Sequence, residues 1–397
     1  MLKVRRNVMA QTTQSSSRME AKRRREMRKS FTQYDYALLF ITLGIALFGV
    51  LMIYSAGYYA ASLLNSPYRF VKQQLIGLGV GFLLMITISK LDYQIFIQTI
   101  AGKKYRITLV HIVYVIALVL QVAVLVVGME YNGAKRWLKF GPLQFQPSEI
   151  TKIVVILFIS YVVYRNRKTL DDFRGFLSIM LYILPLVGFI AKENLSSAIV
   201  VAGISVGMCF VASRKKGYFV ICGLILVGAA ALYIIFGDPF RMQRIQIWLN
   251  VETNEHAHQI KQGLYAIASG GLFGNGLGQS MQKLGYIPEA YNDMIFAVIC
   301  EELGIVGAAM VIIAFIVLFW RIMVIACHAP DIFGTMVCAG VMIQLAIQVV
   351  INVAVVTNSI PSTGIPLPFI SYGGTSEMIM LAEMGLVLGV SRQIRQK

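Results

Sequence analysis

The sequence predicts an all-α protein that crosses a membrane many times. Of its 397 residues 57% are hydrophobic, and the mean hydropathy of +0.69 is far too high for a soluble protein of this size. Stretches of about 20 mainly apolar residues, the length that crosses a bilayer as a helix, recur along the whole chain. The alternating pattern of membrane strands is absent, which argues against a β-barrel.

About ten transmembrane helices are expected, each an apolar stretch bounded by polar or charged residues. Their approximate limits are 36–57, 71–90, 107–129, 147–164, 175–191, 194–212, 217–236, 294–320, 331–356 and 373–391. With the N-terminus inside, 25 of the 36 Lys and Arg residues fall on the inner side, 10 on the outer side, and Lys152 within a span. Cytoplasmic loops carry an excess of positive charge, so both termini are expected to be cytoplasmic.

Composition divides the chain into two regions. Residues 1–34 are basic and polar, and we expect a disordered cytoplasmic tail that sets the topology and contacts anionic lipid. They lack a short apolar stretch with a cleavage site, so no cleavable signal peptide is expected. Residues 35–397 form the ten-span membrane domain, with a large extracellular loop at 237–292 between spans seven and eight. Because much of the net charge of +17 lies in the tail, no nucleic-acid partner is expected.

Three acidic residues stand out near the start of the eighth span. Asp293 lies where the long outer loop becomes this span, and an acid at that position either caps the helix or serves a site beside it. Glu301 and Glu302 follow inside the apolar segment, where a carboxylate costs several kcal/mol. They either bind neighbouring helices or a broken backbone through hydrogen bonds, or take part directly in a site.

Basic residues on the same outer side could complement these acids. Lys135 and Arg136 belong to the segment "AKRW" (134–137), and Arg241 and Arg244 lie three apart on one side of a short amphipathic helix. Such cations could hold a pyrophosphate. The alternative for the second pair is an interfacial helix whose arginines contact lipid phosphates.

Two further stretches are less specific. The glycine-rich segment "SGGLFGNGLGQS" (269–280) lacks the order of a nucleotide-binding loop, and we expect a loop that needs positive φ or close backbone approach. Glu193, between spans five and six, lies either at a charged hairpin tip or in the same pocket as Asp293. The cysteines and histidines are scattered without metal-ligand spacing, so no protein-bound metal is expected.

Three separated motifs resemble those of the SEDS family (shape, elongation, division and sporulation), the membrane glycosyltransferases that polymerise peptidoglycan. They are "NGAKRWLKFGPLQFQPSEITK" (132–152), "GLYAIASGGLFGNGLGQSMQKLGYIPEAYNDMIFAVICEELG" (263–304) and "IPSTGIPLPFISYGGTSEM" (360–378). The stretch "IPEAYNDMIFAVICEELG" looks more like the division and sporulation branch (FtsW and SpoVE) than the elongation branch (RodA).

The resemblance implies an enzyme that joins lipid II units at the outer face of the bacterial cytoplasmic membrane and releases undecaprenyl pyrophosphate. The implied partners are a class B penicillin-binding protein and other division proteins, and the implied place is the division septum. Asp293 matches the family's essential acid, and the last motif contributes Ser371, Tyr372, Gly373 and Gly374 to substrate binding. Many members carry an acid in "PDLG" where this chain has Asn194, which leaves Glu193 as the candidate to supply the charge one position earlier.

The expected mechanism follows from the reaction. A base, Asp293, takes the proton from the acceptor 4-hydroxyl, while Arg and Lys side chains, or a divalent cation, face the leaving pyrophosphate. Two other functions suit the same features: a flippase or transporter for the lipid-linked precursor, and a non-catalytic scaffold for division enzymes.

Overall fold

The computed structural model describes residues 34–101, 107–131, 134–140, 143–217, 219, 223, 224, 228 and 239–394. The basic tail, apart from Tyr34, and most of the expected span 217–236 lie outside the described residues. The number of spans, expected to be ten, and the division into tail and membrane domain therefore stay predictions.

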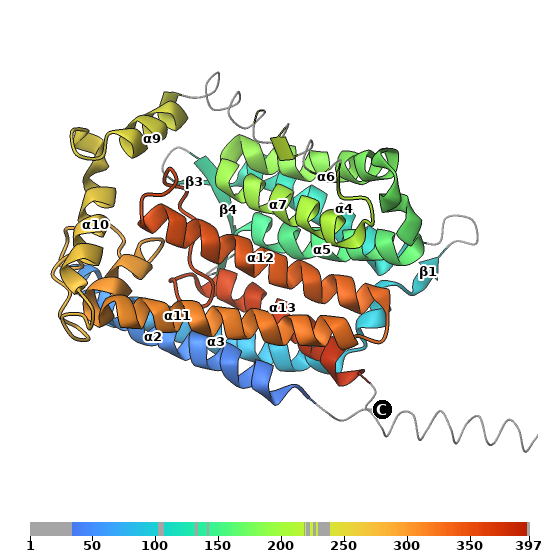
Figure 1. The fold of residues 1–397 in the computed structure, drawn as a ribbon, viewed down its shortest axis with the longest axis horizontal. Helices are drawn as coiled ribbons and strands as arrows, with labels where there is room; N and C mark the ends of the chain where they lie inside the picture. The colour runs from blue at the N-terminus through green and yellow to red at the C-terminus, as the bar shows by residue number, and fades with distance from the viewer. Residues whose placement is uncertain are drawn as a thin grey trace, which may run out of the picture.

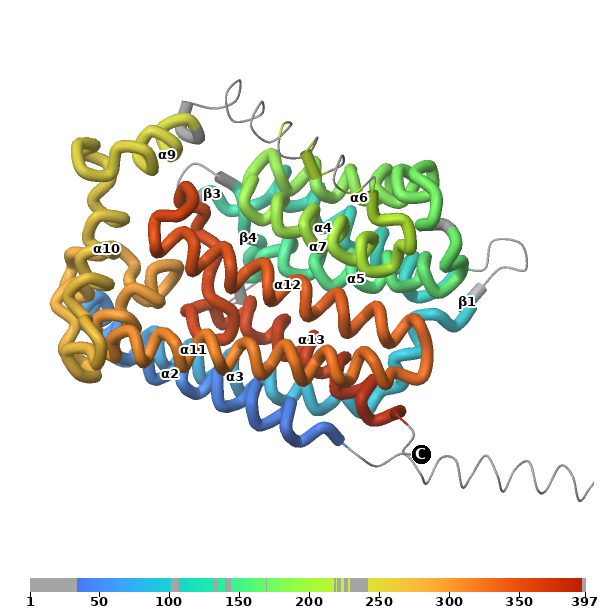
Figure 2. The backbone as a smooth tube through the Cα atoms, viewed as in Figure 1, coloured from blue at the N-terminus to red at the C-terminus, as the bar shows by residue number. Residues whose placement is uncertain are grey.

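Nine long helices among the described residues pack side by side, as Figures 1 and 2 show. They are α2 (Tyr36–Leu63), α3 (Arg69–Lys90), α4 (Leu109–Val127), α5 (Pro147–Arg165), α6 (Phe173–Glu193), α7 (Leu195–Ala212), α11 (Ile295–His328), α12 (Ile332–Val356) and α13 (Gly374–Arg392). All except α13 are long and apolar enough to cross a membrane. Each lies on one of the expected spans, which confirms the helical membrane fold.

Short polar residues set several helix starts. The Asp35 carboxylate accepts a hydrogen bond from the Leu38 N–H at the start of α2, and Asp331 accepts one from the Gly334 N–H at the start of α12. Each satisfies one of the free N–H groups of a first helical turn. At α5 the first residue is Pro147, whose missing N–H is harmless there.

The helix α11 is broken near its beginning. Gly304 has φ of +68°, a backbone conformation that glycine adopts readily and other residues rarely adopt. It separates the helical segments 295–303 and 305–328. At ~1.5 Å per residue the second segment is about 36 Å long, which exceeds the ~30 Å of a hydrocarbon core. The first segment is therefore not needed for the crossing and is free to shape the loop end of the bundle.

Two small sheets lie in the connections between helices. One pairs β1 (Thr99–Ala101) with β2 (Ile107–Thr108), and the other has the order β3 (Met129–Tyr131), β4 (Ala134–Phe140) and β5 (Leu143–Phe145), all antiparallel. The sequence did not predict them, because strands of two to seven residues give no sustained alternation. The long loop is also structured, with helices α9 (Pro239–Leu249) and α10 (His258–Gly270) and a 3₁₀ turn at Glu255–Ala257.

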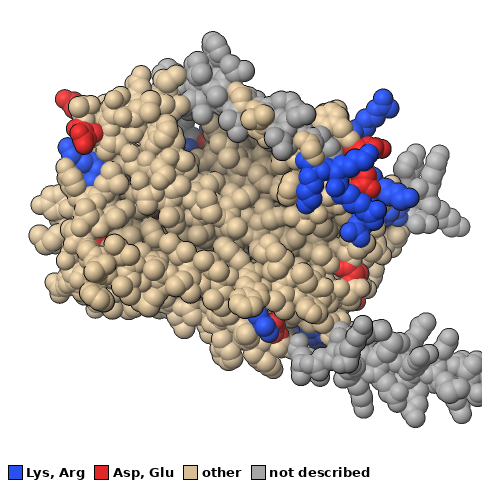
Figure 3. All heavy atoms as spheres, viewed as in Figure 1, with Lys and Arg blue, Asp and Glu red and all other residues tan. Residues whose placement is uncertain are grey.

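Residues 34 and 394, the first and last that the structure describes, lie at the same end of the helix bundle. There Arg321 near the end of α11 pairs with Asp35 at 2.9 Å, and the Arg392 guanidinium donates to the Lys90 carbonyl at 3.0 Å. The helices α9 and α10 of the long loop and the start of α11, two residues after Asp293, lie at the opposite end, on the left in Figure 1. Figure 3 shows most charged side chains at the left and right ends of this face, a small group at its lower edge, and a broad area between them that is nearly free of charge, as expected of a membrane-spanning surface.

Candidate active site

Asp293 lies two residues before α11 begins, and the residue at the helix N-cap is Met294, without a side-chain cap. The side chain of Asp293 is half-buried. Burial raises the pKa of Asp293 to about 6, and Glu289 adds to the rise, while Arg244 and the N–H groups of Asp293 and Met294 oppose it. A carboxylate with this pKa is mostly ionised at neutral pH and can accept a proton.

A buried amide joins Asp293 to the loop before α13. The Asn352 side chain, 1% exposed in α12, donates to the backbone carbonyl of Asp293 at 2.8 Å and to that of Ile365 at 2.9 Å. Gly364, beside Ile365, faces the Asp293 carboxylate and has φ of +69°. The sequence analysis missed Asn352, although an amide inside an apolar span was its signal.

The helix α9 rests on the same loop. Arg244 donates to the Ser362 carbonyl at 3.1 Å, and the Trp248 indole N–H donates to the Asn358 carbonyl at 3.0 Å. Arg244 thus lies close enough to lower the pKa of Asp293. The side chain of Arg241 lies outside the described residues, so its expected role is untested.

Aromatic packing fixes the segment just before Asp293. The ring of Tyr291 stacks on Phe70 of α3 with centroids 4.1 Å apart and meets the ring of Tyr372 edge-on. The Tyr372 N–H donates to the Tyr291 carbonyl at 3.0 Å. Rigid aromatic contacts of this kind place a nearby carboxylate with little freedom.

The turn 371–374 is itself held in place. Ser371 accepts a hydrogen bond from the Leu367 N–H at 2.8 Å, and the Gly373 N–H donates to the Gln74 side chain at 3.1 Å. The Tyr372 hydroxyl bonds Gln73, and Gly374 packs so closely on Gly77 that a side chain at position 77 would clash with it. These contacts join α3 to α13, and the predicted substrate contacts of the four residues stay predictions.

Glu301 and Glu302 hold the loop that leads to Asp293. The buried Glu301 carboxylate accepts hydrogen bonds from the Met281 N–H at 2.9 Å and from the Ser280 hydroxyl. Glu302, also buried, pairs with the Lys283 ammonium at 2.7 Å and accepts a hydrogen bond from Ser55 at 2.6 Å. These are the hydrogen-bonding contacts to neighbouring segments that the sequence analysis gave as the first alternative for both acids.

The glycine-rich segment completes the break in α11. Asn275 N–H donates to the Glu301 carbonyl at 2.9 Å, and the Ile305 N–H donates to the Gly271 carbonyl at 3.0 Å. Gly271, Gly274, Gly276 and Gly278 all have positive φ. The expectation of close backbone approach is confirmed, since the segment satisfies the backbone groups that the break exposes.

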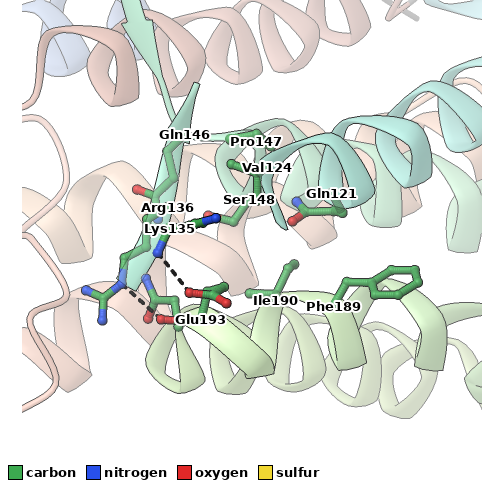
Figure 4. A pocket seen from close by; sticks show the side chains of 11 residues that line it. Gln121, Val124, Lys135, Arg136, Gln146, Pro147, Ser148, Phe189, Ile190 and Glu193 are labelled. Carbon is green, nitrogen blue, oxygen red and sulfur yellow. Dashed lines mark hydrogen bonds between the residues drawn. The ribbon is translucent and has the colours of Figure 1, made fainter. Parts of the chain in front are cut away.

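A separate pocket holds the first basic pair. It is lined by residues of α4, β4, α5, α6 and the α6–α7 turn, among them Lys135, Arg136, Ser148, Glu193 and Asn194. Figure 4 shows the two hydrogen bonds that link β4 to Glu193. Glu193 is therefore part of a pocket with both expected cations, while Asn194 caps α7 through the Ser197 N–H.

A buried ion pair in α5, the helix that carries the pocket residue Ser148, was not predicted from the sequence. Lys152 and Glu149, three residues apart in α5, pair at 2.8 Å. The Ser376 hydroxyl of α13 also donates to Glu149 at 2.9 Å. Glu149 follows the pocket residue Ser148, so these bonds connect the pocket side of α5 to the first turn of α13, just after the turn 371–374. The signal was a charged pair at helical spacing inside an apolar span.

The expected site residues thus form two groups. Asp293 lies with Arg244 and the loop before α13, and Lys135 lies with Arg136 and Glu193. Within the described part of the chain, no three His, Cys, Asp or Glu side chains lie close enough together to hold a metal ion. A base and separate cations near one end of a membrane bundle suit group transfer from a lipid-linked phosphate donor.

Comparisons with known proteins identify the family. The family model for FtsW, RodA and SpoVE, described as cell cycle protein, matches residues 36–396. The chain is 38% identical to stage V sporulation protein E of Bacillus subtilis over 92% of this chain and 98% of that protein. It is 34% identical to a probable peptidoglycan glycosyltransferase FtsW of Trichlorobacter lovleyi over 93% of this chain and 96% of that protein.

Solved structures give the same result. A chain of a peptidoglycan synthase complex aligns with a TM-score of 0.76 at 27% identity, over 92% of this chain and all of that one. The rod shape determining protein RodA of Thermus thermophilus aligns with a TM-score of 0.67 at 28% identity, over 92% of this chain and 99% of that one. The chain therefore belongs to the FtsW, RodA and SpoVE family of cell cycle proteins.

Proposed function

We propose that this chain is a peptidoglycan glycosyltransferase that polymerises lipid II into glycan strands during cell division, with Asp293 as the general base. The observation that carries the proposal is the half-buried carboxylate of Asp293, with a pKa raised to about 6, on a residue whose backbone carbonyl accepts a hydrogen bond from Asn352. Its relatives include two proteins named probable peptidoglycan glycosyltransferase FtsW, which supports the proposal. Asp293 lies two residues before α11, whose start is at the end of the bundle opposite to residues 34 and 394.

The reaction needs a base and a counter-charge. Asp293 accepts the proton of the acceptor hydroxyl, a contribution of about 10²–10⁴ in rate for a positioned base. Lys135, Arg136 and Arg244 are the described cations proposed to face the pyrophosphate of the donor, because guanidinium and ammonium groups offset its charge. Glu301 and Glu302 do not contact the substrate in this proposal. They fix the loop that leads to Asp293 through their contacts with Met281 and Lys283.

We propose an arrangement with both termini cytoplasmic and the active site at the outer face, at the division septum. The excess of Lys and Arg on the expected inner loops supports this orientation. The proposed partner is a class B penicillin-binding protein that crosslinks the strands, and the structural likeness to a chain of a peptidoglycan synthase complex supports it.

The test is polymerisation of lipid II by the purified chain with its partner, followed on a gel with and without a chelator. Asp293→Asn should insert normally and lose at least about a hundredfold in rate, while exposed Glu255→Gln should match the parent. Long glycan strands from Asp293→Asn would refute the assignment. Transport of labelled lipid II into proteoliposomes without polymer would favour the flippase, and neither activity would favour the scaffold.

A further inference from the structure

Strand β4 carries Lys135 and Arg136 but has little local support. Its only sheet neighbours among the described residues are β3 and β5, of three residues each. Successive side chains of a strand point to opposite faces, so the strand by itself does not bring both cations to one ligand. A contact from elsewhere in the fold has to fix the position of this pair.

The turn between α6 and α7 supplies that contact through one residue. The Glu193 carboxylate accepts the backbone N–H of Lys135 at 2.8 Å, and the Glu193 backbone carbonyl accepts the Arg136 Nε–H at 3.0 Å. Figure 4 shows Glu193 bonded to both residues from the neighbouring helix end. These two bonds to successive residues fix the position of β4 relative to the end of α6.

The end of α6 explains why this carbonyl is available. Glu193 is the last residue of α6, where carbonyls lack partners within the helix. The negative end of the helix dipole also favours a guanidinium at that place. Burial lowers the pKa of Arg136, and the nearby Glu193 carboxylate opposes this change, so the guanidinium stays charged in the pocket.

The cations keep donors free for a ligand. Within the described residues, no hydrogen bond occupies the Lys135 ammonium group or the terminal nitrogens of Arg136. One carboxylate and two cations leave the pocket with a net positive charge, beside the neutral side chains of Gln146 and Ser148. That combination suits a phosphate-bearing anion.

We propose that Glu193 is a positioning residue, which holds Lys135 and Arg136 where they bind the pyrophosphate group of the substrate. This inference rests on the proposed function for the identity of the ligand. Asn194 does not share the role, because its side-chain oxygen accepts the Ser197 N–H at 3.1 Å at the start of α7.

Two measurements on the full chain with its partner test the inference: steady-state polymerisation, and binding of inorganic pyrophosphate by calorimetry. Glu193→Ala should raise KM for lipid II and the pyrophosphate Kd about tenfold, with kcat within about twofold, because it removes an anchor of substrate-binding groups. Glu193→Gln keeps an acceptor for the Lys135 N–H, and about a threefold rise is expected. Glu255→Gln is the matched control.

The binding arm separates this inference from the proposed function. If the parent binds pyrophosphate in a Glu193-dependent way but makes no glycan, the proposed function fails and the positioning role stands. A pyrophosphate Kd that is unchanged in both Glu193 variants, or no binding by the parent, overturns the inference. Thermal unfolding identifies a variant that fails to fold, and in that case Glu193→Gln alone decides.

Discussion

The pH dependence of polymerisation is the most direct consequence of the site geometry. Burial raises the pKa of Asp293 from 3.8 to about 6. A base works only in its ionised form, so activity should be present above this pKa and be lost as the pH falls through it. At pH 5 only about a tenth of Asp293 would be ionised, and kcat/KM should be about tenfold below its value at pH 7.

Two variants test what sets the pH at which half of the activity is lost. Glu289 raises the pKa of Asp293, so Glu289→Gln should move the acidic limb to lower pH. Arg244 lowers the pKa, so Arg244→Gln should move the limb to higher pH. The assay is kcat/KM for lipid II between pH 4.5 and 8, limits that span about one and a half units below and two units above the midpoint. An acidic limb near pH 4, or shifts of the opposite sign, would refute the reasoning.

Three further predictions concern the framework of the site. Lys283→Met should destabilise the chain by about 3–5 kcal/mol in detergent unfolding, because it leaves the buried Glu302 without its partner; a loss below about 1 kcal/mol contradicts this. Asn352→Leu removes two hydrogen bonds and should cost about 2 kcal/mol and lower kcat, and unchanged kcat speaks against its role. Gly304→Ala should destabilise by more than about 1 kcal/mol through strain at positive φ, while Gly44→Ala, with open space at its Cβ, should be neutral or stabilising. Equal melting temperatures for these two glycine variants would count against the break in α11.

Much of the membrane fold was readable from the sequence because hydrophobic length is a local property. Nine expected spans lie on long helices, and Asp293 was singled out by its place at the boundary of loop and helix. The short sheets and the break at Gly304 were not predicted. Strands of a few residues leave no periodic pattern, and a break inside an apolar run leaves the hydropathy unchanged.

The sequence by itself determined that the chain is a helical membrane protein and which acids and cations are candidates, because apolar length and charge need no partner to be recognised. Only the tertiary structure decided what each candidate contacts. Glu302 of α11 pairs with Lys283 in the loop before it. Glu193 accepts a hydrogen bond from the Lys135 N–H, 58 positions earlier in the chain. Buried polar groups must find partners wherever the fold brings them, and those partners lie far apart along the chain.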